Sequence, residues 1–101
     1  MHPSEMTGDV LDRAIAKELG YKQCSCGRFH MGTFHAEVDI LNYTSDVAAS
    51  MGLMTEKDWQ YNINNGYVSI YPHTEQFWHN NTIEGIARAI SEAWYSARRN
   101  E

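Results

Sequence analysis

Two stretches of the chain repeat their apolar residues at the period of an α-helix. In the first, residues 7–20, the apolar positions are Leu11, Ala14, Ile15 and Leu19. That spacing places them on one face of a helix. Thr7 precedes them as the expected N-cap, and Gly20 follows as the expected end of the helix.

The second stretch, residues 81–99, predicts a longer helix. Its apolar stripe consists of Ile83, Ile86, Ala87, Ile90, Trp94 and Ala97. We expect Asn81 to cap this helix and Glu84 to complete a capping box. Arg98 and Arg99 lie in the last turn, where the helix dipole favours cations, so their simplest predicted role is helix termination.

Between these helices, shorter patterns predict strands and one further helix. Apolar and polar residues alternate over residues 34–43, as in a half-buried strand, and residues 21–30 are an expected strand that bends or breaks at Gly27. Thr44 or Ser45 is the expected N-cap of a short helix. The predicted buried side of that helix consists of Val47, Met51 and Met54.

The segment WQYNINNGYVSIYP, residues 59–72, predicts a tight β-hairpin. Asn65 and Gly66 favour a type I′ turn, because both tolerate positive φ. The resulting register pairs Asn64 with Tyr67, Ile63 with Val68, Tyr61 with Ile70 and Trp59 with Pro72. All aliphatic residues then share one face, and the opposite face carries Gln60, Asn62, Asn64, Tyr67, Ser69 and Tyr71. Residues 75–80 are expected to add a short edge strand.

The predicted order of elements is α-β-β-α-β-β-(β)-α. We therefore predict a small α+β sandwich in which helices pack on an antiparallel sheet, with residues 1–101 forming a single domain. Length and composition agree with this prediction. A chain of 101 residues supports one modest core, and 43% hydrophobic with 21% charged residues is typical of a globular protein.

Four segments carry a resemblance to a known family. They are LDRAIAKELGY at 11–21, NYTSDVAASMGLM at 42–54, the hairpin at 59–70 and TIEGIARAISEAW at 82–94. Together they resemble the phage ABA-sandwich domain family of small phage and prophage proteins. Residues 22–35 depart from it, since the family commonly has a Trp- and Pro-containing loop there. The resemblance implies a phage gene product that acts inside a bacterial host, and it transfers no catalytic residues.

Charge and hydropathy exclude some classes of function. The chain has 13 acidic residues against 8 Lys and Arg, a formal net charge of −5, and its acids are scattered. Direct nucleic-acid binding depends on clustered cations and is therefore disfavoured. No apolar run reaches the ~18 residues of a membrane span, and the first residues lack the layout of a signal peptide. We expect a protein of the bacterial host cytoplasm, with no membrane partner.

One cluster has the ligand types of a zinc site. Cys24, Cys26, His30 and His35 supply two thiols and two imidazoles. The single residue between the cysteines argues against zinc, because structural sites usually place about two to four residues there. We therefore favour reduced thiols beside solvated histidines, with no cofactor. Zinc and a cysteine nucleophile activated by an imidazole are the alternatives.

A second cluster combines aromatic rings and imidazoles in and after the hairpin. It consists of Tyr67, Tyr71, His73, Trp78 and His79. Aromatic rings rimmed by amides favour protein interfaces and nucleobase stacking. In the alternative interpretation a helix covers this face and the tyrosines belong to the core. With Arg98 or Arg99 added, a nucleotide could be held between two protomers by Tyr67, Tyr71 and Trp78.

These observations favour a non-enzymatic binding protein. The chain has no Gly-rich phosphate loop, HExxH motif or Ser-His-Asp order. We expect a phage-encoded protein that binds a host protein such as a CRISPR effector, as an anti-CRISPR-like inhibitor, through acidic and aromatic surface. We also expect homodimerisation over an exposed edge strand. A small-molecule or nucleotide-sequestering protein is the main alternative, and a zinc-stabilised module is the second.

Overall fold

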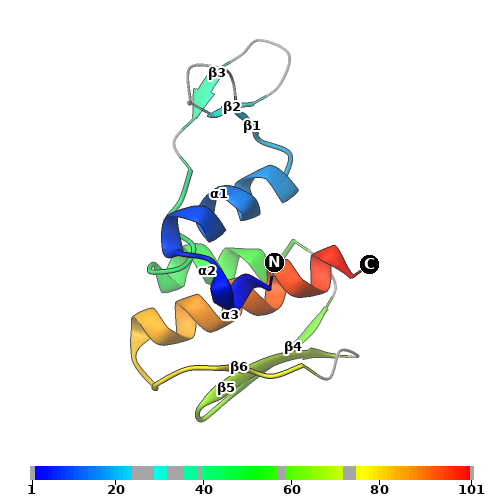
Figure 1. Cartoon of the computed structure of the whole chain (residues 1–101). Helices are drawn as coiled ribbons and strands as arrows, with labels where there is room; N and C mark the ends of the chain where they lie inside the picture. The colour runs from blue at the N-terminus through cyan, green and yellow to red at the C-terminus, as the bar shows by residue number, and fades with distance from the viewer. Residues whose placement is uncertain are drawn as a thin grey trace.

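The fold combines helices with two small antiparallel sheets (Figure 1). The computed structural model describes residues 2–23, 29–31, 36–38, 40–56, 59–71 and 75–100. In chain order its elements are η1 (Pro3–Glu5), α1 (Gly8–Glu18), β1 (Lys22–Gln23), β2 (Phe29–Met31), β3 (Ala36–Val38), α2 (Val47–Leu53), β4 (Gln60–Asn64), β5 (Tyr67–Tyr71), β6 (Phe77–Trp78) and α3 (Ile83–Arg99). The predicted α+β class, with helices packed on antiparallel strands, is confirmed.

Helix α1 begins as predicted, whereas α2 begins later than expected. Thr7 Oγ1 accepts a hydrogen bond from the Val10 N–H at the start of α1. At α2 the cap is Asp46, so the prediction of Thr44 or Ser45 is wrong. The Asp46 carboxylate accepts from two backbone N–H groups of the first turn, which satisfies donors that would otherwise lack a partner.

The buried side of α2 also differs from the prediction. The expected side was Val47, Met51 and Met54. Met54 is partly buried against the core as predicted, but Met51 is 50% exposed, and the buried residues of α2 are Ala49, Ser50 and Leu53. The small side chains of Ala49 and Ser50 let α2 approach its neighbours closely, so this side packs inward and Met51 turns toward solvent.

Helix α3 begins at Thr82, which corrects the prediction of Asn81. Thr82 Oγ1 accepts from the Gly85 N–H at 3.0 Å. Asn81 has a φ of 63° and donates its N–H to His79 Nδ1 at 3.0 Å, so it belongs to the turn before the helix. The predicted apolar stripe is buried or half-buried except at its first position, where Ile83 is 65% exposed.

The hairpin of β4 and β5 has the predicted register. Asn64 pairs with Tyr67, Ile63 with Val68 and Tyr61 with Ile70. The fourth predicted pair includes Pro72, which lies outside the described residues. Strand β6 joins this sheet as expected, antiparallel to β5, so the order is β4-β5-β6. Turn preference and side-chain alternation were therefore sufficient to predict how these strands pair.

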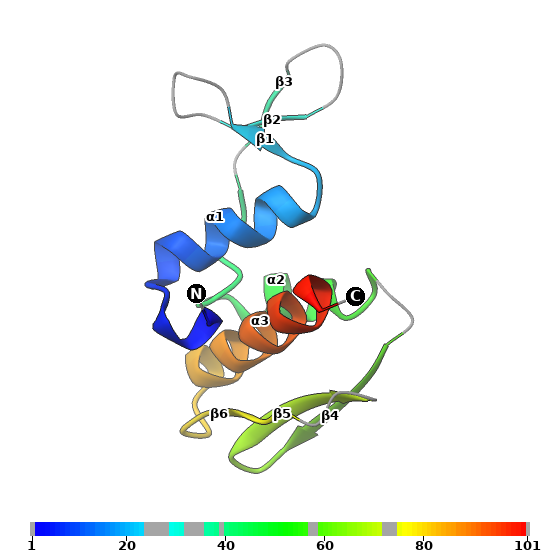
Figure 2. The ribbon, with the colours of Figure 1, turned by 45° about the vertical axis from the view of Figure 1, so that its right-hand side comes forward.

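Helix α3 lies between the β4–β6 sheet and the helices α1 and α2 (Figures 1 and 2). Toward the sheet, one apolar cluster contains Val68, Ile70, Phe77, Ala89, Ile90, Ala93 and Ala97. Toward the other helices, a second cluster contains Leu11, Ile15, Tyr43, Ala49, Leu53 and Trp94. Trp59 and Tyr61 pack against both. The single predicted stripe missed the contribution of Ala89 and Ala93, because α3 is buried on two sides.

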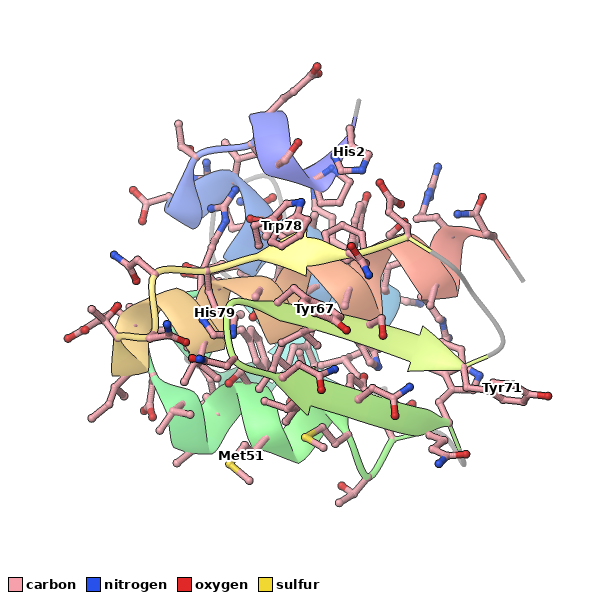
Figure 3. All side chains as sticks on the ribbon, turned by 90° about the horizontal axis from the view of Figure 1, so that it is seen from below. His2, Met51, Tyr67, Tyr71, Trp78 and His79 are labelled. Carbon is pink, nitrogen blue, oxygen red and sulfur yellow. The ribbon has the colours of Figure 1, made fainter. Side chains whose placement is uncertain are left out.

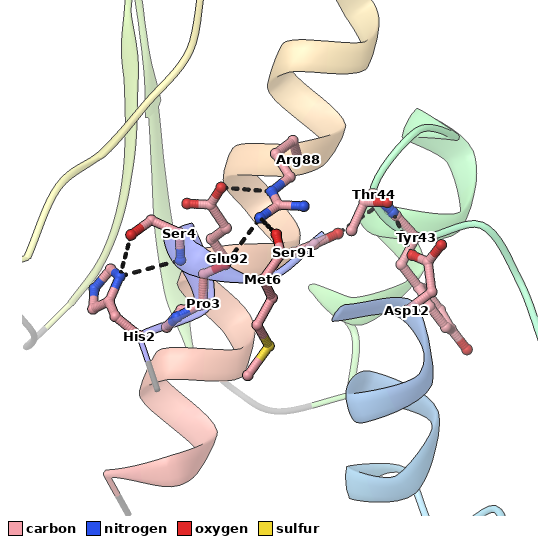
Figure 4. Close-up of polar contacts among 10 residues, drawn as sticks. All are labelled: His2, Pro3, Ser4, Met6, Asp12, Tyr43, Thr44, Arg88, Ser91 and Glu92. Carbon is pink, nitrogen blue, oxygen red and sulfur yellow. Dashed lines mark hydrogen bonds and ion pairs between the residues drawn. The ribbon is translucent and has the colours of Figure 1, made fainter. Parts of the chain in front are cut away.

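Polar side chains attach the segment before α2 to the helices on either side (Figure 4). The carboxylate of Asp12, 6% exposed, accepts from the Thr44 N–H at 2.9 Å. Ser91 Oγ donates to the Tyr43 carbonyl at 2.7 Å. These bonds satisfy buried groups whose lack of a partner would each cost about 1–3 kcal/mol.

Arg88 of α3 attaches the N-terminal segment to the core (Figure 4). Its Nη2 donates to the carbonyls of Pro3 and Met6, and its Nε donates to Glu92 Oε1 at 2.7 Å. Glu92 is 8% exposed, so its charge is compensated by a guanidinium that also orders the backbone around η1.

The second sheet, β1-β2-β3, lies beyond the C-terminal end of α1, away from β4–β6 (Figure 1). It corresponds to the strands predicted over residues 21–30 and 34–43, although its described strands are only two or three residues long. Within the described ranges, none of the helices has the length and hydropathy that a transmembrane segment requires.

Candidate binding surface

The outer side of the β4–β6 sheet carries an exposed group of aromatic and amide side chains. Alternation along the strands buries Val68, Ile70 and Phe77 against α3 and turns their neighbours outward. We call this outer side the aromatic face, and it consists of Gln60, Asn62, Asn64, Tyr67, Ser69, Tyr71 and Trp78. The helix-covered alternative is therefore wrong for this face, because α3 covers the opposite side of the sheet (Figure 3).

The aromatic face carries three aromatic rings, and two of them are largely exposed to solvent. Tyr67 and Trp78 are opposite one another in the β5–β6 register, and their rings meet edge to face with centroids 5.5 Å apart. Trp78 is 70% exposed and Tyr71 is 66% exposed. Tyr71 lies at the far end of β5, apart from the Tyr67–Trp78 pair (Figure 3). A large area of aromatic surface thus faces solvent on paired strands.

His79 has a structural role at the hairpin turn. Its Nε2 donates to the Asn64 carbonyl at 3.0 Å, its Nδ1 accepts from Asn81, and its own N–H donates to the Gly66 carbonyl at 2.9 Å. A carbonyl can only accept and an N–H can only donate, so these bonds define a neutral ring with the proton on Nε2. Both nitrogens of this predicted binding residue are therefore engaged within the chain.

The turn that His79 supports is not the predicted type I′. That type requires positive φ at both central residues, but of the two only Gly66 has it, at 101°. Glycine alone adopts this conformation at little cost, and the two bonds from His79 hold the strand ends on either side of it. The register prediction is confirmed although the turn type was wrong.

Arg98 and Arg99 are directed toward α1 and do not join the aromatic face. Arg98 Nη2 donates to the Glu18 carbonyl at 3.2 Å, and Arg99 Nη1 lies 3.1 Å from Glu18 Oε1. The hydrogen bond that Arg99 donates to the Glu18 carboxylate raises the pKa of Arg99. Within one chain, the predicted nucleotide-binding set is thus divided between two sides of α3.

Most of the predicted zinc ligands lie outside the described residues. They are Cys24, Cys26 and His35. His73, a predicted binding residue of the second cluster, also lies outside the described residues. His30 falls in β2, where only its backbone is described. Among the residues that the structure does describe, no group of three His, Cys, Asp or Glu side chains is arranged to hold a metal ion.

A chain of polar side chains near the N-terminus was not predicted. His2 Nδ1 accepts from the Ser4 N–H at 3.1 Å and lies 2.6 Å from Ser4 Oγ, while Nε2 binds Glu75. Glu75 also accepts from Ser96 of α3 at 3.2 Å. Hydroxyl, imidazole and carboxylate are the components of a nucleophile relay. In this protein, however, His2 Nδ1 also accepts a hydrogen bond from the Ser4 backbone N–H, so that His2 is the N-cap of η1.

This chain also connects the N-terminus to β6. The His2 ring stacks on Phe77, with centroids 5.6 Å apart and an interplanar angle of 13°. Because His2 and Glu75 are 73 residues apart in the sequence, no local pattern indicates that they meet. Their arrangement supports a structural assignment, in which the N-terminal segment is fastened to the edge of the sheet.

A small apolar cavity lies beside α2. It has a volume of about 300 Å³, and its lining includes Leu19, Tyr21, Tyr43 and Leu53. Burial is the main cause that raises the pKa of Tyr43 to about 12, with smaller contributions from Tyr21 and Asp12. The cavity is at the lower limit of size for small-molecule sites, about 300–1,000 Å³.

Comparison with known proteins identified no relative of this chain. Neither family models, curated proteins nor solved structures give a match to the chain. Among the large hydrophobic side chains of the described residues, Trp78 and Tyr71 of the aromatic face are the most exposed, at 70% and 66%.

Proposed function

We propose that this chain is a non-enzymatic binding protein whose aromatic face contacts another protein. The observation that supports this most directly is the exposure of Trp78 and Tyr71, 70% and 66%, beside the paired ring of Tyr67. Monomeric proteins usually bury such rings, whereas protein interfaces are enriched in Trp and Tyr, which contribute much of the binding energy.

The surroundings of these rings also support a protein partner. The residues that define the aromatic face are all uncharged, and amides and a serine lie between the aromatic side chains. An uncharged centre with hydrogen-bonding groups resembles the core of a protein interface, where charged residues are depleted. The rings stand on hydrogen-bonded strands backed by α3, so little conformational entropy is lost on binding.

We propose further that the partner is a bacterial host protein in the cytoplasm, such as a CRISPR effector, and that the chain is of phage origin. The support for this part is the resemblance of the four sequence segments to phage ABA-sandwich proteins. Binding was expected to involve both acidic and aromatic surface, but the residues of the aromatic face are uncharged. Contact through aromatic anchors fits the structure better than acidic mimicry of a nucleic acid.

A homodimer fits the same proposal. Strand β4 is the outer strand of its sheet, and Ile63 on this strand is 43% exposed. An exposed edge strand can pair with the same strand of a second copy, which would extend the sheet and leave the aromatic rings accessible. Each dimer would then present two aromatic faces.

The test compares substitutions inside and outside the aromatic face. Purified CRISPR effectors would be assayed for cleavage of target DNA with the wild-type protein, Trp78→Ser, Tyr71→Ser and Ile83→Ser. Ile83 is a matched control, because it is 65% exposed but lies at the start of α3. We expect Trp78→Ser to weaken inhibition about tenfold or more and Ile83→Ser to leave it unchanged.

Two results would contradict the proposal. If the double variant Tyr71→Ser and Trp78→Ser still inhibits the effector, the interface lies outside the aromatic face. Hydrolysis of an activated ester that is lost in Ser4→Ala would show that the Ser4–His2–Glu75 chain is catalytic, and the protein would then be an enzyme.

A further inference from the structure

A basic groove runs between α1 and the C-terminal half of α3. It has a volume of about 550 Å³, and its lining includes Arg13, Lys17, Glu18, Tyr95 and Arg99. The C-terminal ends of both helices lie on the same side of the molecule (Figure 2), and the contacts of Glu18 with Arg98 and Arg99 join them. The β4–β6 sheet packs on another side of α3, so this groove is separate from the aromatic face.

The charge of the groove is opposite to that of the whole chain. Three cations line it against one carboxylate, although the protein carries a net charge of −5. That carboxylate, Glu18, is already engaged by Arg99 at 3.1 Å and by Arg98 at 3.6 Å. Among the side chains that the structure describes, no acid forms an ion pair with Arg13 or Lys17, which leaves both charges for a ligand.

We propose that the basic groove binds the diphosphate group of a small molecule. Arg13 and Lys17 are four residues apart, which places them one turn apart on the same side of α1, and Arg99 faces them from α3. Guanidinium groups bind phosphate oxygens in pairs, and a lysine adds a compact charge. Because cations stand on both walls of the groove, each wall can bind one of two adjacent phosphates.

The remaining features favour a small ligand over an extended polymer. A volume of about 550 Å³ is within the usual range of small-molecule sites, about 300–1,000 Å³. The half-buried ring of Tyr95 adjoins the cations and offers an apolar surface on which a nucleobase or a sugar can rest. Glu18 is a positioning residue here, because it holds Arg99 at the edge of the groove without being available to the ligand.

The test is calorimetric titration of the full chain with ADP, pyrophosphate, adenosine and a hexaglutamate peptide at low salt, where charge interactions are least screened. We expect ADP and pyrophosphate to bind and adenosine not to bind. Arg13→Gln and Lys17→Gln should each raise Kd about tenfold, the value of one charge-assisted hydrogen bond. Lys22→Gln is the matched control, since it removes the same charge from an exposed residue outside the lining. It should raise Kd less than about twofold.

The probes also separate the two sources of a diphosphate. Tighter binding of ADP than of pyrophosphate, lost in Tyr95→Leu, would identify a nucleotide. Equal binding would identify the diphosphate group alone. The proposal is overturned if neither binds, if hexaglutamate binds more tightly than ADP, or if Lys22→Gln weakens binding as much as Lys17→Gln. Thermal melting of each variant checks that it remains folded.

Discussion

The two sheets of this protein have the same number of strands and the same sequential order, yet they differ in how they are stabilised. In one, β4 and β5 pair over five residues, and α3 covers the inner face through Val68, Ile70 and Phe77. In the other, β1 and β2 pair over two residues, Lys22 and Gln23 are exposed, and Phe29 is buried. Alternation is therefore enough to predict strands, but a sheet becomes part of the core only when a helix covers one of its faces.

Hydrogen exchange should show the largest difference between the two sheets. We expect the amides of β5, the central strand over α3, to exchange only when the whole protein unfolds. Those of β1 should exchange through local opening, about a hundredfold faster or more. Amide exchange followed by NMR measures both rates in one sample, and equal protection would show that the two sheets unfold as one unit.

Substitution of the inner face should have the next largest effect. Ile70→Ala removes a side chain that is 2% exposed between the sheet and α3, so we expect the free energy of unfolding to fall by about 3 kcal/mol. Ile63→Ala is the control on the same hairpin, because Ile63 is 43% exposed and should cost less than about 1 kcal/mol. Urea unfolding compares them, and similar losses would mean that α3 does not determine the stability of this sheet.

The hairpin turn should respond less strongly. Gly66→Ala places a Cβ on a residue with a φ of 101°, so we expect a loss of about 1–2 kcal/mol, although no atom lies within 4 Å of that Cβ. Gly52→Ala is the control, since this helical glycine also has open space and no positive φ. It should raise stability by about 0.5–1 kcal/mol. A neutral Gly66→Ala would show that the bonds from His79 alone maintain the turn.

The smallest effect at neutral pH is expected for Tyr61→Phe. The Tyr61 hydroxyl is buried without a hydrogen-bond partner among the described residues, so its removal should change stability by less than about 1 kcal/mol or increase it. Tyr71→Phe, at an exposed position, should change nothing.

At alkaline pH, Tyr61→Phe should have a larger effect on the free energy of unfolding. Burial raises the pKa of Tyr61 above its ordinary value of 10.0, and it raises the pKa of Tyr43 to about 12. The unfolded chain therefore releases these protons first. The part of the stability that depends on these two protonated tyrosines is therefore fully present below pH 10, and it falls as the pH rises toward the folded pKa values. Urea unfolding across this range should give a shallower decline for Tyr61→Phe, and an unchanged decline would assign it to Tyr43 or other groups.

Sequence reasoning succeeded where local preferences and burial agreed. The alternation of the hairpin placed Val68 and Ile70 inward and Tyr67 and Tyr71 outward, and the structure confirms this division. The caps of α2 and α3 were predicted less well. Several polar residues compete before each helix, and the direction of the preceding backbone decides which side chain reaches the free N–H groups, as the φ of 63° at Asn81 shows.

Contacts between distant residues could not be predicted from local patterns. Arg99 is 81 residues from Glu18, and Arg88 is 85 residues from Pro3. The terminal arginines were expected to end a helix, and they also connect α3 to α1. The basic groove depends on this connection, because Arg13 and Lys17 belong to one helix and Arg99 to the other.

The position of α3 has a consequence for synthesis. This helix supplies one wall of both apolar clusters, and its last buried residue, Ala97, belongs to the sheet-facing one. A nascent polypeptide that ends before α3 therefore carries two uncovered apolar layers. We expect the native state to form only after this helix has left the ribosome, so premature termination upstream of it should yield aggregation-prone products and no partially active fragment.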